Sequence, residues 1–200
     1  LETNLGKLTD NELLGKVNLV AEQYSWHFGP RYLFISGDKN AKLSSQSNGE
    51  FHKIDGLFLI TGVIFLLYKR GKEGMLILLL ALMAPLPSSM VGESPHAGRA
   101  SFMMGSWHII SALGFYFIIS FLKNRYLKFG AILVTIGVLF YFLYGYLGYY
   151  YGEYAKRYAI EWQYGMKQIV EFLDTKENRE KYDQVYMTET RSQPYIFFLF

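Results

Sequence analysis

The link "GESPHAGRAS", residues 92–101, places His96 three residues before Arg99 between two long apolar runs. An arginine presents a planar fork of donors that matches a phosphate, and it stays charged at any working pH. A histidine beside it can donate a second hydrogen bond or move a proton near neutral pH. We therefore interpret His96 and Arg99 as candidate ligands of a phosphate. The alternative is an arginine that lays its stem on apolar surface and keeps its charge in water.

Two further places carry polar groups that could do chemistry. The loop "SGDKN" holds Asp38 and Asn40, which form a possible substrate loop. An Asp in a glycine-containing turn, however, more often bonds its own backbone. His108 follows Trp107 inside an apolar run. An ionisable residue there is either functional or a polar anchor at the membrane interface, and the sequence leaves both readings open.

Composition excludes several classes of protein. Of the 200 residues, 51% are hydrophobic and 18% are aromatic, which is too apolar for an ordinary soluble domain. A net charge of +3 gives no sign of a nucleic-acid-binding surface. The sequence has no cysteine and no pair of histidines four residues apart, so a zinc site built by the protein is not expected. No dinucleotide or phosphate-loop motif identifies a cofactor, and a divalent metal stays an open alternative.

Four apolar runs predict an α-helical multi-pass membrane protein with spans over residues 54–68, 74–91, 102–122 and 129–150. A span needs about 20 mostly apolar residues, so the first two runs are marginal in length. Pro85 and Pro87 interrupt the second run, and irregular backbone at membrane depth is tolerated only against protein or a watery cavity. We therefore expect a cleft at this point.

The charges of the links predict the orientation in the membrane. Lysine and arginine concentrate in residues 69–72 and 123–128, whereas the link with His96 holds only Arg99. Positive residues favour the cytoplasmic side. The sequence thus predicts a plasma (inner) membrane protein with both ends of this chain on the external, periplasmic side.

Two segments flank the predicted bundle, residues 54–154. In residues 1–53, Thr9 and Glu12 have capping-box spacing and open an amphipathic helix. This helix either lies on the membrane or packs on the protein, and a loop follows it. In residues 155–200 a helix and the strand "QVYMTE" suggest the start of an external α/β domain. Because the sequence stops at "QPYIFFLF", we expect a fragment of a longer polypeptide, inactive when isolated.

The order of these elements resembles the C-terminal part of integral-membrane glycosyltransferases of the C-type superfamily. The resemblance is to bacterial proteins of the dolichyl-phosphate-mannose–protein mannosyltransferase-like and aminoarabinose-transferase-like groups. Three stretches carry it: "YSWHFGPRYLFISGDKN", "APLPSSMVGESPHAGRASFMMGSWHIISALG" and the start of the tail, "WQYGMKQIVEFL". Where those proteins often have an Arg-His pair after the Gly-Asp, this chain has Lys42 and Leu43.

The resemblance implies transfer of a sugar from a polyprenyl-phosphate donor to an acceptor, a protein, lipid or glycan, on the outer membrane face. It places His96 and Arg99 near the donor phosphate. It also places the catalytic carboxylate in an earlier external loop that nothing in this sequence matches, so no general base is assigned. Two other classes stay open: a transporter or channel subunit, which would carry ionisable groups inside its bundle, and a non-enzymatic membrane scaffold.

Overall fold

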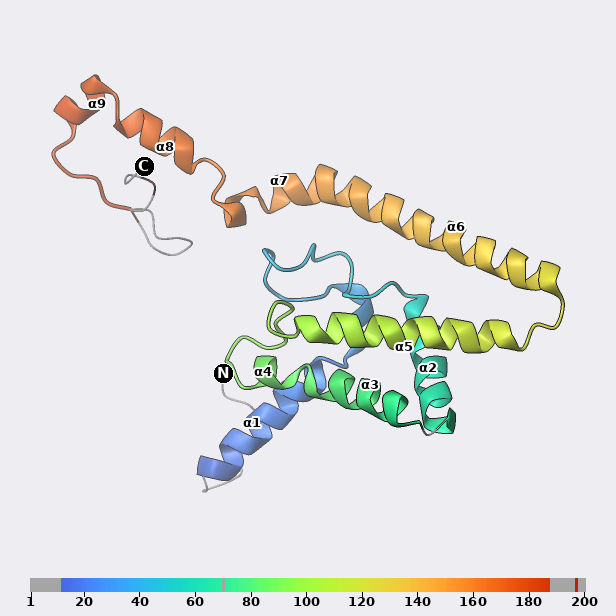
Figure 1. The fold of residues 1–200 in the computed structure, drawn as a ribbon. Coiled ribbons are helices and arrows are strands. Elements are labelled where there is room, and N and C mark those ends of the chain that lie inside the picture. The colour runs from blue at the N-terminus through green and yellow to red at the C-terminus, as the bar shows by residue number, and fades with distance from the viewer. Residues whose placement is uncertain (1–11, 70, 188–196, 198–200) are drawn as a thin grey trace. The chain divides into compact units, whose positions relative to one another are not determined.

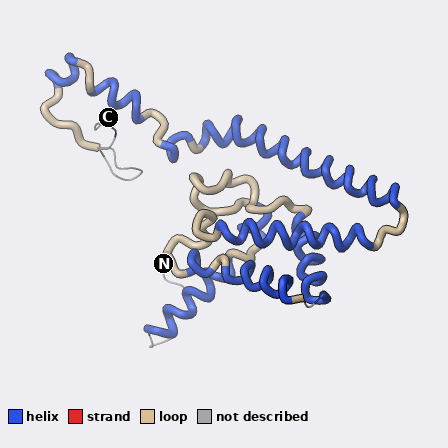
Figure 2. Tube along the Cα trace, in the orientation of Figure 1, coloured by secondary structure: helices blue, strands red, loops and turns tan. Residues whose placement is uncertain are grey.

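The computed structural model describes residues 12–69, 71–187 and 197, and all regular structure in these residues is helical (Figures 1 and 2). The chain divides into two compact units, residues 1–146 and 147–200. Three helical stretches are long and apolar enough to cross a membrane: Lys72–Ser89, Ser101–Ser120 and Arg125–Arg157. These three stretches indicate a membrane protein.

The first unit contains two helices that precede the predicted bundle and most of the helices of the bundle itself, up to Tyr146 in α6. In chain order they are α1 (Glu12–Trp26), η2 (Arg31–Ile35), α2 (Asp55–Lys69), α3 (Lys72–Met83), α4 (Leu86–Ser89), α5 (Ser101–Ser120) and α6 (Arg125–Tyr149). Pro85 stands at the N-cap of α4, so the prolines divide the second predicted span into α3 and α4. The turn between them is the irregular backbone that the sequence predicted.

The first predicted span is α2, which has 15 residues. At 1.5 Å per residue this helix is about 22 Å long, against about 30 Å for the hydrocarbon layer. Because α2 is shorter than the hydrocarbon layer, its assignment as a membrane span stays a prediction.

Glycines let α2 and α5 approach closely. A Cβ atom added at Gly62 would overlap the backbone carbonyl of Ile110, and one added at Gly114 would overlap the carbonyl of Phe58. Where lipid surrounds helices, close backbone packing of this kind replaces the hydrophobic drive for association. Around this contact Leu59, Leu66, Ala81 and Ile110 form a buried cluster that joins α2, α3 and α5.

The start of α2 lies beside the middle of α5, because Ser111 donates a 2.6 Å hydrogen bond to Oδ1 of Asp55. The first half of α5 therefore packs against other parts of the chain. Tyr32, Phe51 and Ala84, from the segments 27–54 and 84–100, cluster with Met103 in this half of α5, and we call these two segments the polar cap.

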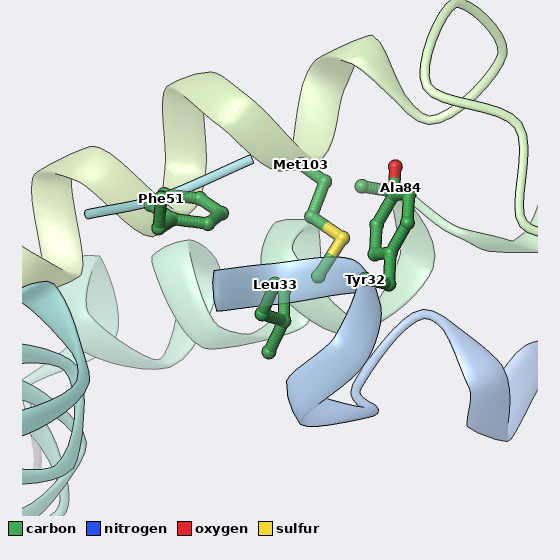
Figure 3. Close-up of a cluster of buried hydrophobic side chains, with 5 residues drawn as sticks. All are labelled: Tyr32, Leu33, Phe51, Ala84 and Met103. Atoms are coloured by element: carbon green, nitrogen blue, oxygen red, sulfur yellow. The ribbon is translucent and has the colours of Figure 1, made fainter. Parts of the chain in front are cut away.

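A buried hydrophobic cluster joins the two segments of the polar cap to α5. Met103 of α5 is fully buried against Tyr32 and Leu33 of η2, Phe51 and Ala84 (Figure 3). The sequence predicted a plain loop over most of this region. Instead Pro30 opens the helical turn η2, which turns Tyr32 and Leu33 inward, and the N–H of Phe51 donates to the carbonyl of Leu33 at 2.8 Å.

The predicted amphipathic helix of the first segment is α1. Its N-terminal cap at Thr9 lies outside the described residues. The hydroxyl of Tyr24 donates to the carbonyl of Leu82 at 2.8 Å, so the C-terminal half of α1 packs on the protein. Leu13 and Val17 stay exposed in the other half.

The second unit contains short helices after the end of α6: η3 (Tyr150–Tyr154), α7 (Ala155–Arg157), η4 (Ala159–Trp162), α8 (Met166–Leu173) and α9 (Lys176–Lys181). The strand predicted over residues 184–189 is absent from residues 184–187, and 188–189 lie outside the described residues. A strand needs a paired neighbour for its backbone groups, and the described part of this unit offers none. The α/β tail is therefore not observed.

Candidate functional site

Asp38 holds the two segments of the polar cap together. Its carboxylate accepts the N–H of Ala97 at 2.7 Å through Oδ2 and the N–H of Asn40 at 2.8 Å through Oδ1. The side chain is only 3% exposed. Both oxygens are thus used to fix the backbone, so the predicted substrate-loop residue Asp38 positions the neighbouring loop and presents no free carboxylate.

A second buried network ties α1 to α4 and to the link that contains His96. His27 is fully buried, with Nδ1 at 3.0 Å from the carbonyl of Gln23 and Nε2 at 2.8 Å from Oγ of Ser88. The carbonyl only accepts, which assigns the proton to Nδ1, so Ser88 donates to Nε2. The same Oγ accepts the N–H of His96 at 2.9 Å.

This Ser88–His27 pair has the geometry of a serine activated by a histidine. Ser88 is fully buried, however, and its oxygen already bonds the His96 backbone. Burial lowers the pKa of His27, which keeps the imidazole neutral. The pair therefore serves to position the link and cannot reach a substrate.

A pocket of about 310 Å³ opens beside the first turn of η2. We call it the cationic pocket, because it carries the positive side chains of Arg31 and Lys39 and no described carboxylate forms an ion pair with either. The Lys39 ammonium lies 5.1 Å from the centre of the Trp26 ring. Its lining residues are Trp26, Gly29, Pro30, Arg31, Tyr32, Gly37, Lys39 and Pro95.

Tyr32 borders both the cationic pocket and the buried cluster. Its hydroxyl oxygen is buried and has no hydrogen-bond partner among the described residues. Burial, with smaller contributions from Glu50 and Asp38, raises the pKa of this phenol strongly. The hydroxyl therefore stays protonated and retains a donor.

A second pocket, of about 340 Å³, shares no lining residue with the first and includes Leu143 and Tyr146 of α6 in its wall. We call it the carboxylate pocket, because Glu50 and Asp55 line it together with the imidazoles of His52 and His108. Ser44, Ser45, Asn48, Phe51, Leu143 and Tyr146 are among its other lining residues. Within the described residues no group of His, Asp and Glu has the arrangement that would hold a metal ion.

Glu50 links the two pockets. Its Oε1 accepts the N–H of Asp38 at 3.3 Å, and the preceding residue, Gly37, lines the cationic pocket. Burial, reinforced by the charge of Asp38, raises the pKa of Glu50 to about 7, although the Asp38 N–H acts in the opposite direction. Glu50 thus changes its charge near neutral pH.

The remaining predicted site residues lie at the surface of the cap. Asn40 is exposed, and its side chain accepts the N–H of Lys42 in a local turn. Nδ1 of His96 accepts the N–H of Arg99 at 3.3 Å, whereas the exposed Arg99 guanidinium forms no ion pair with a described residue. His96 and Arg99 follow Pro95, a wall of the cationic pocket, in the same link.

The sequence analysis singled out His108, which lines the carboxylate pocket, but the patterns predicted none of the other polar groups of the two pockets. Arg31 and Lys39 are eight residues apart around an unpredicted helical turn, so no local motif joins them. The spacing of Glu50, His52 and Asp55 was a usable signal, because two carboxylates and an imidazole fall within six positions directly before an apolar run.

No protein-family model matches the chain, and neither a curated protein nor a solved structure matches it.

Proposed function

We propose that the chain is part of a membrane glycosyltransferase and that its polar cap binds the phosphate of a polyprenyl-phosphate-linked sugar. One observation carries the proposal: the cationic pocket has Arg31 and Lys39 at its wall and Arg99 in the adjoining link, and none of the three forms an ion pair with a described carboxylate. A phosphate is the anion that arginine and lysine together suit best. The reaction class rests on the sequence resemblance.

Geometry supports a role for the His96–Arg99 link in holding this phosphate. Hydrogen bonds from Ala97 to Asp38 and from His96 to Ser88 fix the backbone of the link. Arg99 then extends a free guanidinium from a rigid base, which lowers the entropy lost on binding. In sugar transfer the phosphate is the leaving group, and fixed positive charge stabilises the negative charge that it develops.

We also propose the four-span arrangement, with α2 as a short first span. The polar cap then lies at one end of the bundle, and the basic links 69–72 and 123–128 lie at the other. The positive-inside rule assigns the basic end to the cytoplasm and the cap to the periplasmic side of the inner membrane. A lipid-linked phosphate at the outer membrane surface would meet the cap at this level.

The proposal is tested by sugar transfer in proteoliposomes that contain the protein as the cell makes it, with a panel of polyprenyl-phosphate sugars as donors. Arg99→Lys keeps the charge and loses the planar fork, so we expect a loss of about ten- to hundredfold in rate. His96→Ala should cost less, because its ring already accepts the Arg99 N–H.

Lys123→Arg, at the opposite end of the bundle, is the matched control for expression and insertion. Transfer at the wild-type rate by Arg99→Lys, at matched protein levels, would remove Arg99 from the phosphate site. No transfer from any donor by the wild-type protein would refute the proposed reaction.

A further inference from the structure

The carboxylate pocket is separate from the site proposed for the phosphate, and its chemistry differs. It contains two carboxylates, from Glu50 and Asp55, and two imidazoles, from His52 and His108. Its other polar side chains are the hydroxyls of Ser44, Ser45 and Tyr146 and the amide of Asn48. The pocket thus offers donors and acceptors together, with no excess of positive charge.

Several of these groups keep hydrogen-bonding capacity for a ligand. Oε1 of Glu50 accepts one backbone N–H, whereas Oε2 receives no hydrogen bond from a described residue. Asp55 accepts one hydrogen bond at each oxygen, from Ser111 and from the His52 N–H, so each oxygen retains a lone pair. Nδ1 of His108 bonds the carbonyl of Met104, which leaves Nε2 as an acceptor.

Apolar rings complete the pocket. Phe51, which is 4% exposed, lines it and packs at 4.7 Å between ring centres against His108. The His52 ring stacks on Phe142 of α6 at 5.3 Å. These contacts orient the two imidazoles.

We propose that the carboxylate pocket binds a neutral, hydroxyl-rich ring of the size of one monosaccharide. A sugar hydroxyl both donates and accepts, so it can donate to Glu50 and Asp55 and accept from the amide of Asn48. A volume of about 340 Å³ is at the small end of ligand pockets and suits one ring.

Other ligand classes fit less well. An anion such as phosphate would face two carboxylates at close range, which is repulsive. A bound metal ion needs a cluster of ligands that the described residues do not form. An apolar ligand would leave the carboxylates and the amide unpaired. This proposal rests on the proposed function for the identity of the ligand as a sugar. Binding in the carboxylate pocket does not require the phosphate.

The test uses the protein in lipid nanodiscs and methyl glycosides of mannose, glucose, galactose and arabinose as probes. Ligand-observed NMR titration at pH 8 measures the dissociation constant of each probe. We expect binding of at least one glycoside. Glu50→Gln should weaken it about ten- to hundredfold, since a hydrogen bond to a charged group is lost. Asn48→Ala, at an exposed residue, should weaken it less and should leave the fold intact.

Glu93→Gln in the other cap segment is the matched control and should leave the dissociation constant unchanged, because Glu93 is exposed and lines neither pocket. Failure of all four glycosides to bind would overturn the inference, as would binding that Glu50→Gln and Asn48→Ala leave unchanged. Polyprenyl phosphate without a sugar tests the cationic pocket separately, so a failure of the proposed function is distinguishable from a failure here.

Discussion

Replacing Glu50 with glutamine should make the protein more stable at alkaline pH and leave its stability unchanged at acid pH. The folded state raises the pKa of Glu50 from its ordinary value of 4.5 to about 7. Between these values the folded chain binds more protons than the unfolded chain, so the free energy of unfolding falls as the pH rises. Above pH 7 the loss is complete. Glutamine stays neutral, and its oxygen can still accept the Asp38 N–H.

The size of the effect follows from the shift. A pKa change of one unit corresponds to about 1.4 kcal/mol, which sets a ceiling of about 3 kcal/mol for Glu50. Glu50 is partly exposed, and solvent screening reduces the expected gain to about 1–2 kcal/mol at pH 8. In a chain of this size that gain raises the melting temperature by about 3–6 °C. Below pH 4.5 the gain should vanish.

Thermal unfolding followed by intrinsic tryptophan fluorescence measures this difference, because Trp26 and Trp107 both pack at the polar cap. The titration of His27 occurs in both proteins and cancels in the comparison. Glu93→Gln, which makes the same change at an exposed position, is the matched control. An equal offset for Glu50→Gln at pH 4.5 and pH 8, or a lower melting temperature at pH 8, would refute the reasoning about the buried carboxyl.

Three other predictions concern packing, the buried network and orientation. Gly62→Ala should destabilise the bundle by about 1–3 kcal/mol, because the added Cβ would overlap backbone atoms of α5. Gly105→Ala adds a Cβ in open space and should be neutral or stabilising in thermal unfolding. Equal effects of the two substitutions would contradict the close approach of α2 and α5. Ser88→Ala should cost about 1–3 kcal/mol, because it leaves the partner imidazole and a backbone N–H unpaired; an unchanged melting temperature would show that the network carries no stability. In this cysteine-free chain, Gly98→Cys should react with an impermeant thiol reagent in intact cells and Gly71→Cys should not; the reverse pattern would invert the topology.

Much of the helical part of the fold could be predicted from the sequence. Long apolar runs predict the three stretches Lys72–Ser89, Ser101–Ser120 and Arg125–Arg157, because crossing a bilayer needs about 20 mostly apolar residues. The helical turn η2 could not be found this way. It is stabilised by long-range contacts of Tyr32 and Leu33 with Met103, which no local pattern records.

The candidate site was predictable only in part. His96 and Arg99 stand out because Arg99 is the only basic residue in the link between the second and third apolar runs. The partners of Asp38 and the grouping of Glu50 with His108 depend on the depth at which α2 meets α5, and the Asp55–Ser111 contact sets that depth. Sequence separation hides such contacts, so the pockets emerged only from the folded structure.

The central claim is that the polar cap binds a lipid-linked phosphate, and equilibrium binding of polyprenyl phosphate to the protein in neutral-lipid nanodiscs tests it most directly. The double variant Arg31→Ala/Lys39→Ala removes the charge of the cationic pocket, and Lys123→Ala/Lys128→Ala removes equal charge at the opposite end. We predict saturable binding that weakens with salt and falls at least about tenfold in the first variant only. Equal affinity in both variants, or equal binding of the uncharged polyprenol, would contradict the account.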